Sequence, residues 1–305
     1  MKFLEFLESI RTPFFDAFFS AVTHFGEETI FIVVGLIFFW CISKKQGYYI
    51  LSIGFAGTVI NQFLKLWFRI PRPWVRNPDF KPIESAIGEA TGYSFPSGHT
   101  QTSVGVFGGI GRIFKNTAIR IICAALCLLV PFSRMYLGVH TPADVCVSFV
   151  IAIVLIFVLY PIVNKAFEKP RNMRIFFASM IAVSIAYLLF VLLYSFPADI
   201  DTANYTSGVK NAYKILGCIL GLWISFEIDN KFINFETEAV WWAQIIKLLL
   251  GVVPILLIKS LLKAPLYALC GGSYIADGIR YFLIVVFAGC VWPLTFKFFK
   301  KISTK

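Results

Sequence analysis

The chain has 305 residues, of which 58% are hydrophobic, 17% aromatic and only 15% charged, and its mean hydropathy is +0.77. This composition excludes an ordinary soluble domain and indicates a polytopic membrane protein. The net charge of +11 lies mainly in short connections between apolar segments, which favours a membrane partner and gives no indication of a nucleic-acid partner. We expect an all-α, polytopic transmembrane helix bundle, because backbone polar groups within the bilayer must be satisfied internally.

The N-terminal residues 1–26 have the pattern of a helix that lies in the membrane interface. Glu5, Glu8, Thr12 and Asp16 recur every three or four residues, opposite phenylalanines and leucines. A partly buried re-entrant helix would show the same pattern. Because Glu5 and Glu8 interrupt the apolar stretch, we do not expect a signal peptide here.

Nine apolar segments follow as candidate membrane spans. They cover residues 28–43, 47–64, 99–114, 118–135, 142–163, 174–195, 208–226, 242–263 and 280–299. A charged connection at residues 164–174, which contains Pro170, separates the part with ionisable clusters from a part without them. We therefore expect a boundary near residue 165.

The connections after the first, third and fifth candidate spans are rich in lysine and arginine. Cytoplasmic loops carry such an excess of positive charge. The basic residues are Lys44, Lys45, Arg112, Lys115, Arg120, Lys165, Lys169, Arg171 and Arg174. This pattern predicts that the intervening loops, which contain residues 65–98 and 136–141, face away from the cytoplasm.

One short stretch places a cation, an imidazole and a carboxylate beside an apolar segment. Arg134 precedes His140 by six residues, and Asp144 follows it by four. A neutral imidazole can attack phosphorus, a carboxylate can orient its far N–H, and a guanidinium suits phosphoryl oxygens. Thr141, Pro142 and Asp144 also form an ordinary capped helix start, and both interpretations can hold together.

The longest loop of the first half carries five basic residues on the side where they should be scarce. These residues are Lys65, Arg69, Arg72, Arg76 and Lys81. An anionic phosphate substrate would explain them, although contact with anionic lipid headgroups would explain two or three. The third histidine of the chain, His24, lies in the N-terminal segment without evident partners.

The loop ends at Pro96-Ser97-Gly98-His99, directly before a segment with a helical pattern. Glycine lets the backbone approach a ligand, Ser97 can cap the helix or donate its hydroxyl, and free N–H groups at a helix start attract anions. His99 could act as a general acid and base. A capped helix with a surface histidine explains this tetrapeptide equally well.

Taken together, the three segments resemble the signature of the type 2 phosphatidic acid phosphatase (PAP2) family, which shares its site with vanadium haloperoxidases. The matching pattern is Lys65-x6-Arg72-Pro73, then Pro96-Ser97-Gly98-His99, then Ser133-Arg134-x5-His140-x3-Asp144, with all eleven specified positions present. The resemblance implies a PAP2-like six-helix core over residues 1–165, with an N-terminal interfacial helix and about five spans. Residues 166–305 would be a C-terminal transmembrane extension of unknown role.

The resemblance also implies roles for individual residues. Lys65, Arg72, Arg134, Ser97 and the backbone of Gly98 would bind phosphate. His140 would attack phosphorus, Asp144 would orient it, and His99 would protonate the leaving group and then activate water. Many membrane members of the family hydrolyse lipid phosphates or diphosphates without a metal ion.

We therefore expect an integral-membrane phosphatase that acts through a phosphohistidine. Its substrate would be an isoprenyl diphosphate, a phosphatidate or a phosphatidylglycerophosphate. A phosphotransferase of the same family and an anion transporter without phosphatase activity are the alternatives. The seven cysteines are scattered, without metal spacing or a disulfide framework. We expect no cofactor and no metal, and the sequence does not indicate an oligomeric state.

Overall fold

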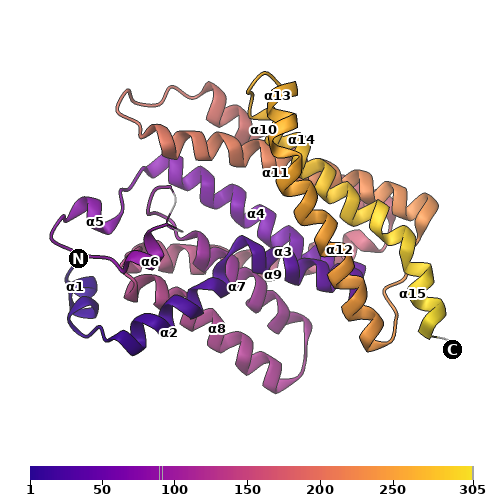
Figure 1. Ribbon diagram of the computed structural model, residues 1–305, viewed down its shortest axis with the longest axis horizontal. Helices are drawn as coiled ribbons and strands as arrows, with labels where there is room; N and C mark the ends of the chain where they lie inside the picture. Colours follow the sequence, from indigo (N-terminus) through magenta and orange to yellow (C-terminus); the bar gives the residue numbers. More distant parts are fainter. Residues whose placement is uncertain (89, 91, 304–305) are drawn as a thin grey trace. The chain divides into compact units, whose positions relative to one another are not determined.

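The computed structural model describes residues 1–88, 90 and 92–303, and every regular element in this part of the chain is a helix (Figure 1). Seven helical segments are long and apolar enough to cross a membrane: Lys44–Arg76, Thr117–Tyr136, Pro142–Phe167, Pro170–Leu193, Thr202–Ile233, Trp241–Leu261 and Ile275–Lys300. The predicted all-α, multi-pass transmembrane fold is therefore confirmed.

Two predicted spans have a different form in the structure. Residues 99–114 correspond to α7 (Gly98–Ile113), whose 16 residues reach about 24 Å, less than the roughly 30 Å of a hydrocarbon core. Residues 28–43 form the second arm of a bent pair, Pro13–Gly26 and Glu28–Ile42, with 52° between the arms. This geometry fits a broken span or a re-entrant segment. A re-entrant helix was the alternative to an interfacial helix for the N-terminal residues.

Packing divides the chain into two compact units, and we describe each by itself. Unit 1 comprises residues 1–34, 49–161 and 198–208, and unit 2 comprises 35–48, 162–197 and 209–305. Four helices have residues in both units: α3 (Glu28–Ile37), α4 (Lys44–Phe68), α9 (Pro142–Phe167) and α11 (Thr202–Ile228). The predicted boundary near residue 165, with a core over 1–165 and an extension over 166–305, stays a prediction.

Unit 1 is built on α7 and α8 (Thr117–Tyr136), which pack against each other and against the N-terminal segment. The other elements that lie wholly in unit 1 are α1 (Lys2–Ser9), α2 (Pro13–Thr23), η1 (His24–Gly26), α5 (Pro73–Arg76) and α6 (Glu84–Ile87). Small residues let α7 approach α4 closely. A Cβ atom would lie 2.9 Å from Ile53 at Gly105, and 2.8 Å from Ile50 at Gly109.

Helices α4 and α7 pack antiparallel to each other. Gln101 lies against Gly57, where a Cβ atom would be 2.7 Å from its Nε2 atom, and Gly98 lies nearest to Asn61. The first residues of α7 are therefore placed beside the last turns of α4. That arrangement brings two of the three motif segments to one end of unit 1.

Unit 2 contains one short helix from the first part of the chain, η2 (Phe38–Ile42), and the C-terminal helices. The C-terminal helices are α10 (Pro170–Leu193), η3 (Asp229–Ile233), α12 (Trp241–Leu261), α13 (Lys263–Leu269), α14 (Ile275–Val286), η4 (Phe287–Val291), η5 (Trp292–Thr295) and α15 (Phe296–Ser303). Trp40 is fully buried here, and its Nε1 atom donates a hydrogen bond to the Ala288 carbonyl at 2.8 Å. Helices α11 and α14 touch through glycines, because a Cβ atom at Gly217 would lie 2.1 Å from the Gly278 carbonyl oxygen.

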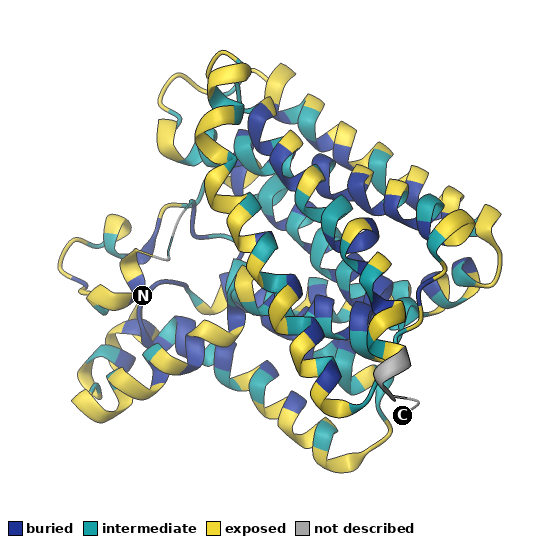
Figure 2. Ribbon diagram, turned by 45° about the vertical axis from the view of Figure 1, so that its right-hand side comes forward, coloured by how far each residue is buried: buried dark blue, intermediate teal, exposed yellow. Residues whose placement is uncertain are grey.

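The long helices have one buried side and one exposed side (Figure 2). On α8, Ile121, Ile122 and Leu128 are 63%, 61% and 65% exposed, whereas Cys127 and Val130 are buried. Exposed aliphatic side chains of this size are unfavourable in water and suit a hydrocarbon environment. These sides are therefore the ones that lipid covers.

Candidate active site

The start of α7 lies beside the last turns of α4. Ser97 is the N-cap, and its hydroxyl oxygen accepts a hydrogen bond from the backbone N–H of Thr100 at 3.4 Å. The N–H of Ser97 donates to the Asp144 carbonyl oxygen at 3.2 Å, which joins the start of α7 to the start of α9. Gly98 is the first helical residue, so its N–H group belongs to the set that a helix start leaves for an anion.

A tight turn between α8 and α9 places His140. The N–H groups of Val139 and His140 both donate to the Arg134 carbonyl oxygen, at 3.1 and 3.3 Å. Gly138 has a φ of +79°, which glycine adopts without strain, and a Cβ atom there would lie 2.8 Å from Phe80. The turn therefore holds the backbone of His140 against the last turn of α8, which carries Arg134.

The two ring nitrogens of His140 face groups of opposite charge. Nε2 lies 3.0 Å from Nη1 of Arg72, and Nδ1 lies 3.4 Å from Oδ2 of Asp144. Burial lowers the pKa of His140 well below its ordinary value of 6.5, and the charges of Arg72, Arg134 and Lys65 act in the same direction. The imidazole is therefore neutral at pH 7, which is the nucleophilic form.

The Asp144 carboxylate has two roles in the local structure. Its Oδ2 atom accepts a hydrogen bond from the backbone N–H of Thr141 at 2.8 Å, as at an ordinary helix start. The same oxygen accepts from the hydroxyl of Ser94 at 2.6 Å, and both side chains are buried. The helix-start interpretation is thus confirmed. The orienting role of Asp144 stays a prediction, because Nδ1 of His140 lies 3.4 Å from Oδ2 and has no hydrogen-bond partner among the described residues. Ser94 was not among the predicted site residues.

Two predicted phosphate ligands are buried and held by backbone carbonyls. Lys65 is 6% exposed and donates to the carbonyl oxygen of Tyr93. Arg72, also 6% exposed, donates from Nε to the Gly92 carbonyl at 3.0 Å and from Nη1 to the Val139 carbonyl at 2.9 Å. These carbonyl acceptors fix the positions of both cations.

Arg134 is fully buried, and its Nη1 atom donates to Oγ1 of Thr23 at 2.7 Å. Arg69, by contrast, follows the end of α4 at a φ of +49° and donates from Nη1 to the Leu66 carbonyl at 2.9 Å. Arg69 thus satisfies a carbonyl of the last helical turn, as side chains at helix C-termini do. Of the loop cations, only Lys65 and Arg72 are buried.

His99 faces the N-terminal segment. A Cβ atom at Gly26 would lie 2.9 Å from both the Cβ and the carbonyl oxygen of His99, so η1 touches the start of α7. The Nε2 atom of His99 is buried and has no hydrogen-bond partner among the described residues. Burial lowers the pKa of His99, and Arg134 adds to this shift. His24 is not without partners as the sequence suggested, because its ring pairs with the Glu27 carboxylate.

The eight predicted site residues therefore all lie in unit 1 and meet around His140. They are Lys65, Arg72, Ser97, Gly98, His99, Arg134, His140 and Asp144. No group of three or more histidine, cysteine, aspartate or glutamate side chains among the described residues could hold a metal ion. The site can bind an anion with several negatively charged oxygens next to a neutral imidazole.

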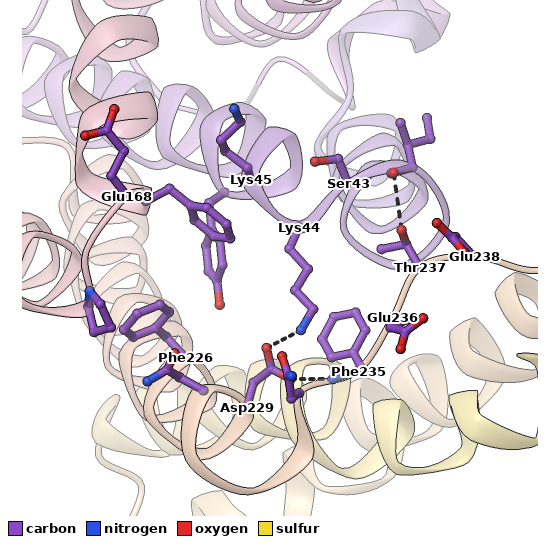
Figure 3. A pocket seen from close by; sticks show the side chains of 16 residues that line it. Ser43, Lys44, Lys45, Glu168, Phe226, Asp229, Phe235, Glu236, Thr237 and Glu238 are labelled. Atoms are coloured by element: carbon purple, nitrogen blue, oxygen red, sulfur yellow. Dashed lines mark hydrogen bonds and ion pairs between the residues drawn. The ribbon is translucent and has the colours of Figure 1, made fainter.

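Unit 2 contains a separate cavity of about 570 Å³ (Figure 3). Residues of both charges line it. Lys44 bonds to Asp229 at 2.5 Å and lies 3.8 Å from the centre of the Phe235 ring, and Lys300 pairs with Glu236. The lining contains two lysines and four carboxylates, so the cavity lacks the excess of cations found at the site in unit 1.

A helical membrane bundle with buried cations around a neutral histidine defines a membrane protein that handles phosphate groups. The sequence profile of the PAP2 superfamily matches residues 45–168, and the profile described as the PAP2 superfamily phosphatase transmembrane extension matches residues 213–304. The chain belongs to the PAP2 superfamily. It is a membrane-bound phosphoric ester hydrolase.

Two curated relatives come from Bacillus subtilis. An undecaprenyl-diphosphatase is 35% identical over 148 residues, which are 43% of this chain and 74% of the relative. A phosphatidylglycerophosphatase B is 27% identical over 179 residues, which are 54% of this chain and 81% of the relative. The crystal structure of a transmembrane PAP2-type phosphatidylglycerolphosphate phosphatase from Bacillus subtilis aligns with 53% of this chain and 83% of its own, at 26% identity and a TM-score of 0.45.

Proposed function

We propose that the protein hydrolyses a lipid phosphate or diphosphate through a covalent phosphohistidine on His140, without a metal ion. The arrangement of His140 between Arg72 and Asp144 carries this proposal. The carboxylate at Nδ1 favours the tautomer that leaves a lone pair on Nε2, and the guanidinium stands where phosphoryl oxygens would bind.

In the first step, the phosphoryl group enters among Lys65, Arg72 and Arg134. Its anionic oxygens are better acceptors than the imidazole, so Arg72 turns from Nε2 to the substrate. Nε2 of His140 then forms a bond to phosphorus while the bond from phosphorus to the leaving oxygen breaks. His99, whose protonated form is favoured by the negative charge of the bound phosphoryl group, gives its proton to that oxygen. The hydroxyl of Ser97 and the N–H of Gly98 complete the phosphate cradle.

In the second step, a water molecule replaces the leaving group. His99, now neutral, takes a proton from the water as its oxygen attacks phosphorus and the bond to Nε2 of His140 breaks. Inorganic phosphate leaves and both histidines return to their starting state. The protein contributes positioning and fixed positive charge around the developing pentavalent phosphorus.

A membrane lipid is the proposed substrate class. Trp67 and Phe68, at the end of α4 that carries Lys65, are 46% and 52% exposed, as suits side chains at a membrane interface. The two curated relatives are named for lipid substrates, one a diphosphate and one a monophosphate. Both classes therefore belong in the first assay.

We place the active site on the non-cytoplasmic face, in a catalytic core over residues 1–165. The loops with Lys44, Lys45 and Arg112 would then be cytoplasmic. Labelling of single cysteines in intact cells, one near Arg76 and one near Lys115, tests this orientation. We expect a membrane-impermeant reagent to modify only the first.

Phosphate release by the purified protein tests the proposed function. The assay contains EDTA and compares lipid monophosphates, lipid diphosphates and soluble sugar phosphates, with His140→Ala as the matched variant. We expect release from one lipid class that is insensitive to EDTA and absent in the variant. Release only when a hydroxyl acceptor is added would favour a phosphotransferase, and anion flux without phosphate release would favour a transporter.

A further inference from the structure

The N-terminal segment forms one side of the proposed active site, although it lies before the part of the chain that matches the PAP2 superfamily profile. We propose that Thr23, at the end of α2, is a positioning residue that fixes the guanidinium of Arg134 for phosphate binding. This inference rests on the proposed function. It assigns the segment a part in catalysis that an interfacial anchor would not have.

The contact that carries the inference is a buried hydrogen bond. Nη1 of Arg134 donates to Oγ1 of Thr23 at 2.7 Å, and the two residues are 0% and 5% exposed. A guanidinium at the end of a flexible side chain can point in several directions, and each fixed N–H reduces that freedom. A hydrogen bond to a charged donor is also stronger than one between neutral groups. Thr23 therefore selects one orientation of Arg134.

Further contacts hold α2, the helix that ends at Thr23, against α8, the helix that carries Arg134. Arg11 donates to the Tyr136 carbonyl oxygen from Nη2 at 3.0 Å, and the Tyr136 hydroxyl donates to Oδ1 of Asp16 at 2.8 Å. These contacts join α2 to the last turn of α8, two residues beyond Arg134. The position of Thr23 is thus set by contacts other than its own hydrogen bond.

The turn after Thr23 contacts α7 as well as α8. At Gly26, a Cβ atom would lie 2.9 Å from His99 and 2.9 Å from Cγ1 of Val130, which leaves no room for a side chain. Residues 23–26 therefore touch both α7 and α8, the two helices that supply His99 and Arg134.

Two substitutions separate the hydroxyl from the shape of the side chain. Thr23→Val removes the acceptor and keeps the volume, and Thr23→Ser keeps the acceptor and removes a methyl group. Ser20→Ala is the matched control, because Ser20 lies one turn earlier on α2 and its hydroxyl bonds to the exposed Ser85 hydroxyl, at 3.1 Å, and to no other described side chain. All variants are compared with the full-length wild-type protein in one detergent.

The readouts are steady-state hydrolysis and the dissociation constant of inorganic phosphate. A misdirected catalytic group costs about 10- to 100-fold in rate, so we expect Thr23→Val to lose that factor in kcat/KM and to bind phosphate more weakly. Thr23→Ser and Ser20→Ala should resemble the wild type in both, with unchanged melting temperatures. In an Arg134→Ala background, Thr23→Val should weaken phosphate binding no further, since it acts through Arg134.

Contrary results would be unambiguous. Wild-type phosphate binding and turnover in Thr23→Val would overturn the inference, as would equal losses in the valine and serine variants. An additional loss in the Arg134→Ala background would show that Thr23 acts by another route. If the wild-type protein neither binds phosphate nor releases it from any substrate, the proposed function itself fails.

Discussion

The two units bury charge in different ways. Among the described residues, unit 1 buries three cations around one carboxylate: Lys65, Arg72, Arg134 and Asp144. Unit 2 buries two cations and two carboxylates: Lys247, Arg280, Asp229 and Asp277. Gathering like charges in a buried site costs free energy. We propose that an anion bound among these three cations offsets that cost.

The partners of the buried cations show the same difference. Arg280 pairs with Asp277, whose other oxygen accepts from the Tyr267 hydroxyl at 2.6 Å. Arg72 and Lys65 instead donate to backbone carbonyls, which hold the cations but leave their charge. Asp277 thus balances the charge of Arg280, while Lys247, like Lys65, donates to a backbone carbonyl, that of Thr237 at 3.1 Å. The difference between the units lies in the Arg280–Asp277 ion pair and in the number of cations gathered around Asp144.

The largest effect is expected from removing the nucleophile. Loss of one member of a catalytic group costs several orders of magnitude in other enzymes, so His140→Ala should reduce kcat about 10⁴-fold or more. Phosphate release at substrate saturation measures this loss, and the melting temperature checks folding. Turnover within tenfold of the wild type would remove His140 from its proposed role.

A pair of carboxylate substitutions sharpens the comparison between the units. Asp144→Asn should fold normally and lose about 10³- to 10⁴-fold in kcat, because the imidazole then adopts the wrong tautomer. Asp277→Asn should keep its specific activity and melt at a lower temperature, because it weakens the pair with Arg280. Equal activity losses in the two variants would contradict the assignment of a catalytic role to Asp144 and a structural role to Asp277.

A pair of arginine substitutions makes the same comparison for cations. Arg72→Met should lose about 10²- to 10³-fold in kcat/KM without loss of stability, because it relieves repulsion among three cations. Arg280→Met should leave activity unchanged and destabilise the fold by about 3–5 kcal/mol, because Asp277 remains buried and unpaired. Thermal unfolding and phosphate release are measured on both. A destabilised Arg72→Met would mean that its charge is structural.

The pH dependence gives the smallest expected effect. Because the pKa of His140 lies below its ordinary value, its imidazole stays neutral as the pH falls from 7 through 6.5. The acid limb of kcat/KM, which reports the free enzyme, should therefore lie below pH 6.5. Removing the Arg72 charge raises the pKa of His140, so the acid limb of Arg72→Met should move to higher pH. An unshifted limb would mean that His140 does not control it.

Much of the candidate site could be predicted because charged residues beside apolar spans are visible in the sequence. Lys65, Arg72 and Arg134 stand out against their surroundings, and the spacing of His140 and Asp144 suits one turn of a helix. The apolar segments likewise predicted the transmembrane helices. In each case the signal is local.

Contacts made over long stretches of chain were not predictable in this way. The hydroxyls of Ser94 and Thr23 resemble any others in sequence, and their partners are 50 and 111 residues away. Residues 35–48 pack with the C-terminal helices, but their composition does not differ from that of the neighbouring segments and so does not predict this packing. Register between distant helices depends on three-dimensional packing, which a single sequence does not record.

The most direct test is to trap the covalent intermediate. The wild-type protein is mixed with its lipid phosphate substrate, quenched within milliseconds in alkali, where phosphohistidine is stable, and digested for mass spectrometry. We predict one added phosphoryl group on the peptide that contains His140, formed in the presence of EDTA and more abundant in His99→Ala given a substrate with a good leaving group. A turning-over enzyme with no phosphoryl group on His140 would contradict the account.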